Sequence, residues 1–330
     1  MNVIGIDVSK RHLDLAMVDE RGLLLEEKRI DNTSSAICRT LRAWQRKKNR
    51  DRSPLVCLEP TGHYSFGVVK VLVGLGLPVR LAHPRAIQLS GGMQRGKSDP
   101  VDAKRIAMYA LRFRENAHMV NERYLRMGEF KQLLAFRKRL VKDRAMYRAQ
   151  RTDNIQYMEK RAKECASKGI DSILRALERS LSKVEREIEA FIANDKELAR
   201  KRTLAMSVNG VGRVLANEII AATEGFSRFE TARQLVCYIG AAPFERSSGS
   251  SVRGKAHVSQ MACKPLKSLF HMGAMAAVRS KGDIQDYYNR KIAQGKKPMS
   301  VLNAVRGKII HHIWAVLKSG EPYKPYLQMT

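Results

Sequence analysis

Four acidic residues lie where predicted strands end or where a predicted helix begins. Asp7 closes the apolar run VIGID, and Glu59 closes the apolar run LVCLE. Asp99 and Asp102 stand three positions apart at the start of a helical segment, a spacing that puts both on one helix face. If the two strands are neighbours and the helix returns across their ends, the four carboxylates meet at one point.

Four carboxylates in one small site need a counter-charge, because like charges drive protonation or unfold the site. Mg²⁺ takes oxygen ligands in near-octahedral geometry and keeps positions open for phosphate oxygens. Two such ions about 3.5–4 Å apart hold the attacking and leaving oxygens of an in-line displacement. The pattern therefore predicts a Mg²⁺ site, with Mn²⁺ as a substitute ion, and a substrate that contains phosphate.

Each acidic residue also has an ordinary structural interpretation. Asp7 could form a turn, and Glu59 could simply be solvated. Asp99 suits a helix N-cap, and Asp102 suits a first helical turn. A sugar kinase of the actin-like fold also opens on such a strand, but it needs a glycine for close approach to ATP phosphates, and residues 7–10 (DVSK) contain none.

A serine-rich segment, RSSGSSVRGK at 246–255, is a second place where chemistry could occur. A serine hydroxyl is a weak nucleophile until a group takes its proton, and no pattern of a catalytic triad is readable nearby. From the residues alone, we favour a flexible loop that contacts a phosphate backbone through its hydroxyls and through Arg246, Arg253 and Lys255.

The first third of the chain alternates strand and helix signals. We expect strands at 3–7, 13–19, 23–31, 55–60 and 79–84 and helices at 34–48, 68–76, 86–93 and 101–113. Three antiparallel strands followed by alternating helices and strands predict a mixed sheet with helices on its faces, which is the order of the ribonuclease H-like fold. Cys57, inside an apolar strand, is expected in the core.

Strand signals vanish between about 114 and 200, where two long charged helices are predicted. The second helix carries apolar residues close to a heptad repeat, at Ile173, Leu174, Leu177, Leu181, Val184, Ile188 and Ile192. A helical hairpin packed on its own domain and a dimerising coiled coil fit this pattern equally well.

The last third is predicted to be mainly helical, with polar loops at 245–256 and 293–299. Its glycine-rich turn around Gly210 and Gly212 resembles a helix-hairpin-helix, whose backbone amides can contact phosphate. We therefore predict a metal-binding α/β domain at 1–125, a helical coiled-coil segment at 126–197 and a mainly helical domain at 198–330.

The charge of the chain points to a polyanionic partner. Lys and Arg number 61 against 32 Asp and Glu, which gives a net charge of +29 and favours nucleic acid. No apolar run approaches the ~18–20 residues of a membrane-spanning helix, and no signal peptide opens the sequence. Five scattered cysteines without CxxC spacing fit a reduced cytoplasm rather than disulfides or a zinc site.

Five segments carry a resemblance that covers nearly the whole chain. In order they are GIDVSK, CLEPTGHY, KSDPVDAKRIA, VNGVG and YIGAAPFERSSGSSVRGK. The chain resembles the DEDD transposases of the "one-ten" class of bacterial insertion sequences, whose relatives include pilin-gene DNA invertases and recombinases guided by a bridge RNA. The family's four metal-binding acids correspond to Asp7, Glu59, Asp99 and Asp102, and its nucleophilic serine, which precedes a glycine, corresponds to Ser248.

The resemblance implies a RuvC-like domain at 1–125, a transposase domain with the serine at 198–330, and one composite active site. It implies a site-specific DNA recombinase in which the serine attacks a phosphodiester and holds one DNA end as a phosphoserine. Its partners would be target and donor double-stranded DNA, a noncoding bridge RNA and further copies of the chain, as dimers that assemble into a tetramer. A bacterial cytoplasmic, nucleoid-associated location would follow.

The resemblance is imperfect at 259–267, where the family often has Ser-Lys-x-Gly-x-x-x-Leu-Arg and this chain reads SQMACKPLK. Lys267 replaces an arginine, so a bidentate contact with phosphate is lost at that position.

Two other functions remain open from the sequence. The chain could be a RuvC-like, metal-dependent nuclease of branched DNA in which the serine loop is passive. It could also be a nucleic-acid-binding protein without catalysis. If the chain is a recombinase, Ser248→Ala would abolish recombination, whereas a nuclease with a passive serine loop would still cleave DNA. If the chain is a non-enzymatic binding protein, Asp7→Ala would have no effect apart from changes in binding.

Overall fold

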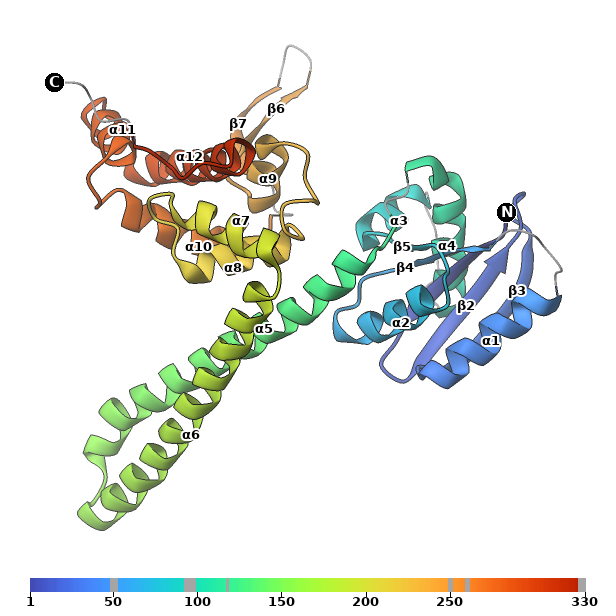
Figure 1. Cartoon of the computed structure of the whole chain (residues 1–330), viewed down its shortest axis with the longest axis horizontal. Coiled ribbons are helices and arrows are strands. Elements are labelled where there is room, and N and C mark those ends of the chain that lie inside the picture. Colours follow the sequence, from blue (N-terminus) through green and yellow to red (C-terminus); the bar gives the residue numbers. More distant parts are fainter. Residues whose placement is uncertain (48–52, 92–98, 117–118, 249–251, 259–261, 326–330) are drawn as a thin grey trace. The chain divides into compact units, whose positions relative to one another are not determined.

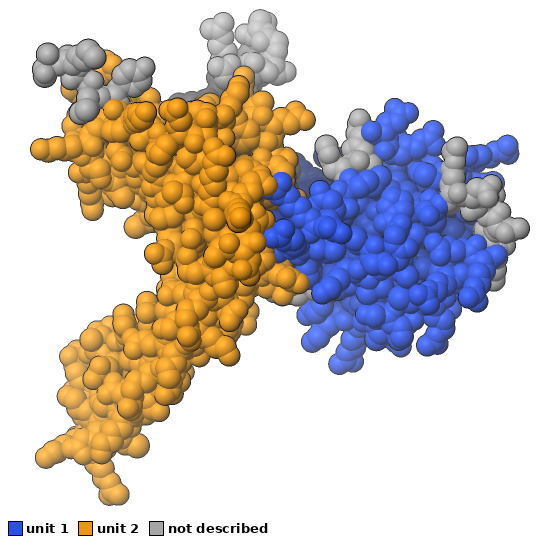
Figure 2. All heavy atoms as spheres, viewed as in Figure 1, with its two compact units in different colours: residues 1–128 blue, residues 129–330 orange. Residues whose placement is uncertain are grey.

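The structure is a computed structural model of the 330-residue chain. It describes residues 1–47, 53–91, 99–116, 119–248, 252–258 and 262–325. Within these ranges the backbone alone is described at 47, 63, 99–100, 116, 154, 245–248 and 252–257. The chain forms two compact units, 1–128 and 129–330, coloured separately in Figure 2. The division into three domains stays a prediction.

Unit 1 is built on a five-stranded mixed sheet. Its strands are β1 (Val3–Val8), β2 (His12–Val18), β3 (Leu24–Asp31), β4 (Leu55–Leu58) and β5 (Val79–Leu81). The sheet order is β3-β2-β1-β4-β5, in which β1, β2 and β3 are antiparallel neighbours and β1, β4 and β5 are parallel neighbours. The predicted mixed sheet with helices around it is confirmed.

Four helices lie on the two faces of this sheet (Figure 1): α1 (Ser34–Lys47), α2 (His63–Gly74), α3 (Pro84–Ser90) and α4 (Asp99–Arg112). Strand side chains alternate between faces, so Ile4 and Ile6 pack in one core with α1 and α2. Val3 and Cys57 pack in the other core with α3 and α4, as expected for Cys57. The helix predicted at 68–76 begins earlier, at His63, just after Gly62 with its positive φ of 66°.

Gly5 allows α4 to lie directly on β1. A Cβ added at Gly5 would collide with the carbonyl oxygen of Ala103 and the backbone nitrogen of Ala107. The later turns of α4 reach the β2–β3 turn, since a Cβ on Gly22 would lie 2.9 Å from the side chain of Met108. Helix α4 therefore starts over the carboxyl end of β1 and runs back toward its amino end.

Helix α5 (Glu122–Ala149) spans the boundary between the two units, and unit 2 contains the remaining elements. Its helices are α6 (Lys160–Ala193), α7 (Lys196–Met206), α8 (Arg213–Ala222), α9 (Ala232–Ile239), α10 (Lys264–Ala277), α11 (Asp283–Ala293) and α12 (Pro298–Ser319), and its strands are β6 (Pro243–Ser248) and β7 (Val252–Val258). Short helical turns lie at η1 (Arg114–Asn116), η2 (Gln150–Asn154) and η3 (Ile155–Tyr157).

Helices α5 and α6 form an antiparallel hairpin (Figure 1). Three ion pairs cross it in reversed sequence order, Arg137–Glu185 at 2.8 Å, Arg148–Glu178 at 2.9 Å and Arg151–Asp171 at 3.0 Å. Most of the predicted heptad residues are buried, namely Leu174, Leu181, Val184, Ile188 and Ile192. The structure thus shows the hairpin interpretation, and pairing of this segment with a second copy stays a prediction.

Helix α12 lies at the centre of the C-terminal core. Val305, Ile309, Ile310 and Ile313 are fully buried in a cluster to which helices α7 to α11 all contribute. The turn between α7 and α8 packs against α10, because a Cβ on Gly210 would collide with the carbonyl oxygen of Gly273. Gly210 therefore has a packing role in this fold.

The prediction of a polar loop at 245–256 is wrong, because β6 and β7 pair as an antiparallel hairpin there. Backbone N–H and C=O groups make such a ladder, so polar strands such as PFERSS leave no apolar alternation in the sequence. The loop predicted at 293–299 is shorter than expected, since α12 begins at Pro298, a residue favoured in the first helical turn. Among the described helices, none has the length and apolarity to cross a bilayer.

Candidate active site

Asp7 and Glu59 lie at the carboxyl ends of neighbouring parallel strands. Ile6 of β1 is paired with Leu58 of β4, so the next residue on each strand is Asp7 and Glu59. Both side chains are half-buried. The sheet register therefore brings these two predicted acids to adjacent positions at one edge of the sheet.

Helix α4 covers the face on which these acids lie. Strand alternation puts Asp7 on the same face as Gly5, against which Ala103 packs. Glu59 lies near Cys57 on that face: burial raises the pKa of the Cys57 thiol to about 12, and the charge of Glu59 contributes to the rise. The first turn of α4, which carries Asp99 and Asp102, thus starts over the end of β1.

The side chain of Asp102 is bound within its own helix. Arg105 donates from Nη1 to Oδ1 of Asp102 at 2.7 Å, and each side chain is 25% exposed. For Asp99 the backbone is placed as the first residue of α4, whereas its side chain lies outside the described atoms.

The donor chemistry of the four acids fits a hard divalent cation, because carboxylate oxygens are the ligands that Mg²⁺ and Mn²⁺ prefer. Within the described residues, no group of three or more His, Cys, Asp or Glu side chains is assembled closely enough to hold a metal ion. The structure therefore brings together Asp7, Glu59 and the start of α4 but shows no finished ligand set among the atoms that it describes.

Asp14, a fifth carboxylate at this edge, was not singled out from the sequence. It lies directly across from Asp7 on β2, and its side chain is only 5% exposed. Arg29 of β3 binds it through both oxygens, with Nε 2.9 Å from Oδ1 and Nη2 3.0 Å from Oδ2. An aspartate inside the apolar run LDLAMV is the sequence signal that could have revealed it.

Ser248 is the last residue of β6 and is paired with Val252 of β7. Its backbone is placed, but its side chain lies outside the described atoms, as do the side chains of residues 245–247. Gly249, Ser250, Ser251 and the segment 259–261 of the altered motif lie outside the described residues altogether. Ser248 belongs to unit 2 and the four acids to unit 1, so the composite site stays a prediction.

The base of the β6–β7 hairpin is fixed to the helices of unit 2. Asn303 of α12 donates from Nδ2 to the carbonyl oxygen of Ala241 at 2.8 Å. The guanidinium of Arg228 lies 5.1 Å from the ring centroid of Tyr238, within the range of a cation–π contact. Burial raises the pKa of Tyr238, and the neighbouring Cys263 adds to the rise. These contacts hold the residues that lead into the strand carrying Ser248.

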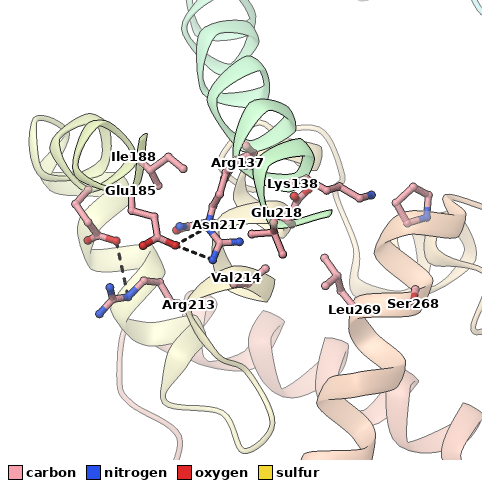
Figure 3. A pocket seen from close by; sticks show the side chains of 14 residues that line it. Arg137, Lys138, Glu185, Ile188, Arg213, Val214, Asn217, Glu218, Ser268 and Leu269 are labelled. Carbon is pink, nitrogen blue, oxygen red and sulfur yellow. Dashed lines mark hydrogen bonds and ion pairs between the residues drawn. The ribbon is translucent and has the colours of Figure 1, made fainter. Parts of the chain in front are cut away.

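A cavity of about 520 Å³ lies within unit 2 between α5, α6, α8 and α10 (Figure 3). Its wall combines apolar side chains with ion pairs, including Arg137–Glu185 at 2.8 Å and Arg213–Glu189 at 3.8 Å. Burial raises the pKa of Glu218, which lines the cavity. The lining residues run from Leu134 to Leu269 on four helices, so no local sequence pattern predicted the cavity.

Two sequence families match the chain in order. Residues 4–155 match the family DEDD_Tnp_IS110, described as a transposase. Residues 202–289 match the family described as "Transposase IS116/IS110/IS902 family". The first match includes all four predicted acids, and the second includes Ser248.

Individual relatives agree with these families. A "Probable family 20 transposase" of Pseudomonas aeruginosa is 27% identical over 46% of this chain and 44% of its own length. An insertion element IS110 protein of Streptomyces coelicolor is 30% identical over 47% of this chain and 39% of its own length. The chain thus spans less than half the length of these two relatives. The transposase of insertion sequence element IS1111A from Coxiella burnetii is 23% identical over 98% of this chain and 92% of its own length.

Among solved structures, RuvC of Thermus thermophilus in complex with a Holliday junction substrate is 17% identical over 36% of this chain and 99% of its own length. The TM-score is 0.29, a value at which the likeness supports neither a fold nor an activity. With both family matches in chain order and the IS1111A transposase aligned along nearly the whole chain, this chain belongs to the DEDD transposases of IS110-class insertion sequences.

Proposed function

We propose that this protein is a site-specific DNA recombinase that cleaves and rejoins DNA to move an insertion sequence. The observation that carries the proposal is the register of β1 and β4, which sets Asp7 beside Glu59 under the first turn of α4. Family membership and the net charge of +29 support the same conclusion. We further propose a ribonuclease H-like unit 1, which the strand order β3-β2-β1-β4-β5 supports.

Asp7, Glu59, Asp99 and Asp102 are proposed to hold divalent cations, Mg²⁺ or Mn²⁺. When bound, such ions neutralise charge that develops on the phosphate during displacement. The chain's own contribution is to fix the acids, because the packing of α4 on Gly5 sets the height of Asp99 and Asp102 above the sheet edge. The contact from Arg105 to Oδ1 of Asp102 orients that carboxylate on the first turns of α4.

Ser248 is proposed as the nucleophile. Its Oγ would form an ester bond to the scissile phosphorus, the bond from phosphorus to the leaving DNA oxygen would break, and that oxygen would take up a proton. Rejoining reverses these changes with a second DNA end, so bond energy is conserved and no ATP is needed. The position of Ser248 in a paired strand, at the end of a hairpin fixed to α12, supports this role.

The proposed partners are target and donor double-stranded DNA, a noncoding bridge RNA, and further copies of the chain as dimers within a tetramer. The proposed location is the bacterial cytoplasm, in association with the nucleoid, where DNA and RNA are both present. The excess of Lys and Arg supports polyanion binding and predicts a steep loss of affinity with salt. If affinity were unchanged between low and moderate salt, the electrostatic part of the proposal would be wrong.

The test uses the full chain, co-purified with RNA from cells that carry its native flanking DNA. Incubation with labelled DNA and Mg²⁺ should give a covalent protein–DNA adduct that survives denaturation. Ser248→Ala should abolish the adduct, whereas the neighbouring Ser247→Ala should retain it. The alternative, a RuvC-like nuclease of branched DNA, predicts that Ser248→Ala still cleaves in a Mg²⁺-dependent way and that no adduct forms in any variant.

A further inference from the structure

Arg306 of α12 is a buried cation whose partners are all uncharged or basic side chains in the described part of the chain. It is 6% exposed. Its Nη1 donates to Oδ1 of Asn303 at 3.3 Å, and its Nη2 contacts Nδ1 of His271 at 2.8 Å. Its Nε is buried and has no hydrogen-bond partner. No described carboxylate forms an ion pair with Arg306.

The described groups around Arg306 give acceptors to its two Nη atoms and none to its Nε. A guanidinium can only donate, so Nδ1 of His271 must accept and its Nε2 carries the ring hydrogen. Lys267 of α10 lies close enough that the charge of Arg306 lowers the pKa of its ammonium, in addition to a larger effect of burial. Burial also lowers the pKa of Arg306. Two cations thus influence each other here, and no described carboxylate forms an ion pair with either of them.

This cluster, which we call the Arg306 cluster (Lys267, His271, Asn303 and Arg306), adjoins the base of the β6–β7 hairpin. The ammonium of Lys267 lies 3.7 Å from where a Cβ on Gly240 would stand. Asn303 donates to the next carbonyl, that of Ala241. The chain runs from these residues directly into β6, the strand that ends with Ser248.

A buried charge without a counter-ion destabilises the folded state, because its lost hydration is not replaced. Surface cations of this chain keep their water, whereas the guanidinium of Arg306 does not. A phosphate would supply acceptor oxygens to the guanidinium, whose Nε has none, and to the ammonium of Lys267, on which the charge of Arg306 acts. Arginine binds phosphate in this manner through its planar fork of donors.

We propose that the Arg306 cluster is a phosphate-binding site, occupied in the working complex by a backbone phosphate of bound nucleic acid. The bound phosphate would lie beside Gly240 and Ala241, which lead into the strand that ends with Ser248. That this phosphate belongs to nucleic acid rests on the proposed function. Binding of inorganic phosphate does not, because that binding needs only the Arg306 cluster. Asn303 is a positioning residue, since it orients the guanidinium and holds Ala241.

The test is thermal unfolding of the full chain without nucleic acid, in inorganic phosphate and in chloride at equal ionic strength. Phosphate should raise the Tm of the wild type by about 2–4 °C when present well above its Kd. Arg306→Met and Lys267→Gln should lose this rise. Lys318→Gln, an exposed cation at the end of the same helix, should keep it.

The sign of the stability change separates the phosphate site from a structural role. If Arg306 exists for an anion, Arg306→Met should unfold in chloride at the same Tm as wild type or a higher one, because the uncompensated charge is gone. A structural arginine would lower the Tm when replaced. If Arg306→Met does not fold, Lys267→Gln gives the same comparison from a half-buried position. A phosphate-induced rise in Tm that is equal in wild type, Lys267→Gln and Lys318→Gln would overturn the assignment.

A second measurement links the Arg306 cluster to nucleic acid. Each of Arg306→Met and Lys267→Gln should reduce the slope of log K against log salt for DNA binding by about 1, as expected when one phosphate contact is lost. A covalent adduct at Ser248 together with no effect of phosphate on the Tm would support the proposed function and contradict the phosphate site at the Arg306 cluster. A rise in Tm with phosphate, but no covalent adduct, would support the phosphate site and contradict the proposed recombinase.

Discussion

Asp7 of β1 lies directly opposite Asp14 of β2, and Asp14 lies opposite Arg29 of β3, so the three side chains form a row across the sheet. The bidentate contact from Arg29 compensates the charge of Asp14, whose side chain is 5% exposed. Without that contact, Asp14 would lie opposite Asp7 with no cation bound to it, at the sheet edge where the metal-binding acids are proposed. Arg29 thus lets the sheet carry Asp14 beside Asp7.

The first prediction concerns this row. Arg29→Gln should lower the free energy of unfolding by about 1–3 kcal/mol, because it leaves a buried carboxylate without its charged partner. We expect a loss in the lower part of this range, because the Arg29 side chain is 52% exposed and solvent weakens its interaction with Asp14. Urea denaturation measures the loss. The double variant Arg29→Gln/Asp14→Asn should recover much of it, and a double variant as unstable as the single one would contradict this account.

The second prediction concerns removal of metal. Mg²⁺ should raise the Tm of the wild type relative to EDTA, since an ion that binds only the folded state stabilises it. Asp7→Asn and Glu59→Gln should lose this response and all DNA cleavage. In EDTA the same variants should be as stable as wild type or more so, because a like charge has been removed.

Glu27→Gln is the matched control for these two variants, as Glu27 is an exposed acid on β3. It should keep both the Mg²⁺ response and cleavage. A Mg²⁺-dependent rise in Tm that persists in Asp7→Asn would place the ion elsewhere on the protein.

Much of unit 1 was predictable because its information is local. Buried strands such as VIGIDV and LVCL are apolar on both faces, so they can be recognised from the sequence. Acidic residues that end such apolar runs are therefore expected at strand ends, independently of the loop conformations. The strand order makes β1 and β4 neighbours, and the register observed between them sets Asp7 beside Glu59. The catalytic roles of the acids and of Ser248 stay predictions.

The parts that could not be predicted depend on contacts between distant segments. The polar strands β6 and β7 form through backbone pairing, which leaves no hydrophobic pattern. Asp14 acquires its partner only when β3 folds against β2. Lys267 stands where the family motif often has an arginine, and only the folded chain shows that the charge of Arg306 of α12 acts on its ammonium. No spacing rule connects residues so far apart.

The third prediction tests how α4 is seated. Gly5→Ala should lower stability by about 1–3 kcal/mol, because the new methyl group collides with the backbone of α4 at Ala103 and Ala107. It should also reduce Mg²⁺-dependent cleavage at temperatures where the protein remains folded, since α4 carries Asp99 and Asp102. Gly67→Ala is the control: Gly67 lies inside α2 with open space around its Cβ position, so alanine there should be neutral or stabilising by up to about 1 kcal/mol. Equal effects of the two substitutions on cleavage would show that the seating of α4 is not what matters.

The fourth prediction concerns Glu218 at the cavity of Figure 3. Burial raises its pKa, while Lys138 and Arg137 partly offset the rise. The folded state therefore holds the proton of Glu218 more tightly than the unfolded state does, so this group lowers stability as the pH rises from its unfolded pKa through its folded pKa. Below the unfolded pKa the carboxyl is protonated in both states and the penalty is absent.

Glu218→Gln removes that titration at nearly constant shape and should therefore be more stable than wild type at neutral pH. The difference between the two proteins should shrink as the pH is lowered and vanish once Glu218 is protonated in both states. Urea unfolding at a series of pH values measures it, with Glu187→Gln, an exposed acid on α6, as a control expected to show little change. The opposite trend, in which Glu218→Gln loses stability relative to wild type as the pH rises, would mean that the ionised carboxylate is stabilised by Lys138 and Arg137 more than it is penalised by burial. In that case the carboxylate of Glu218 is stabilised in the folded protein by its basic neighbours, and burial is the smaller effect. The sign of the slope of the stability difference against pH decides between these two descriptions.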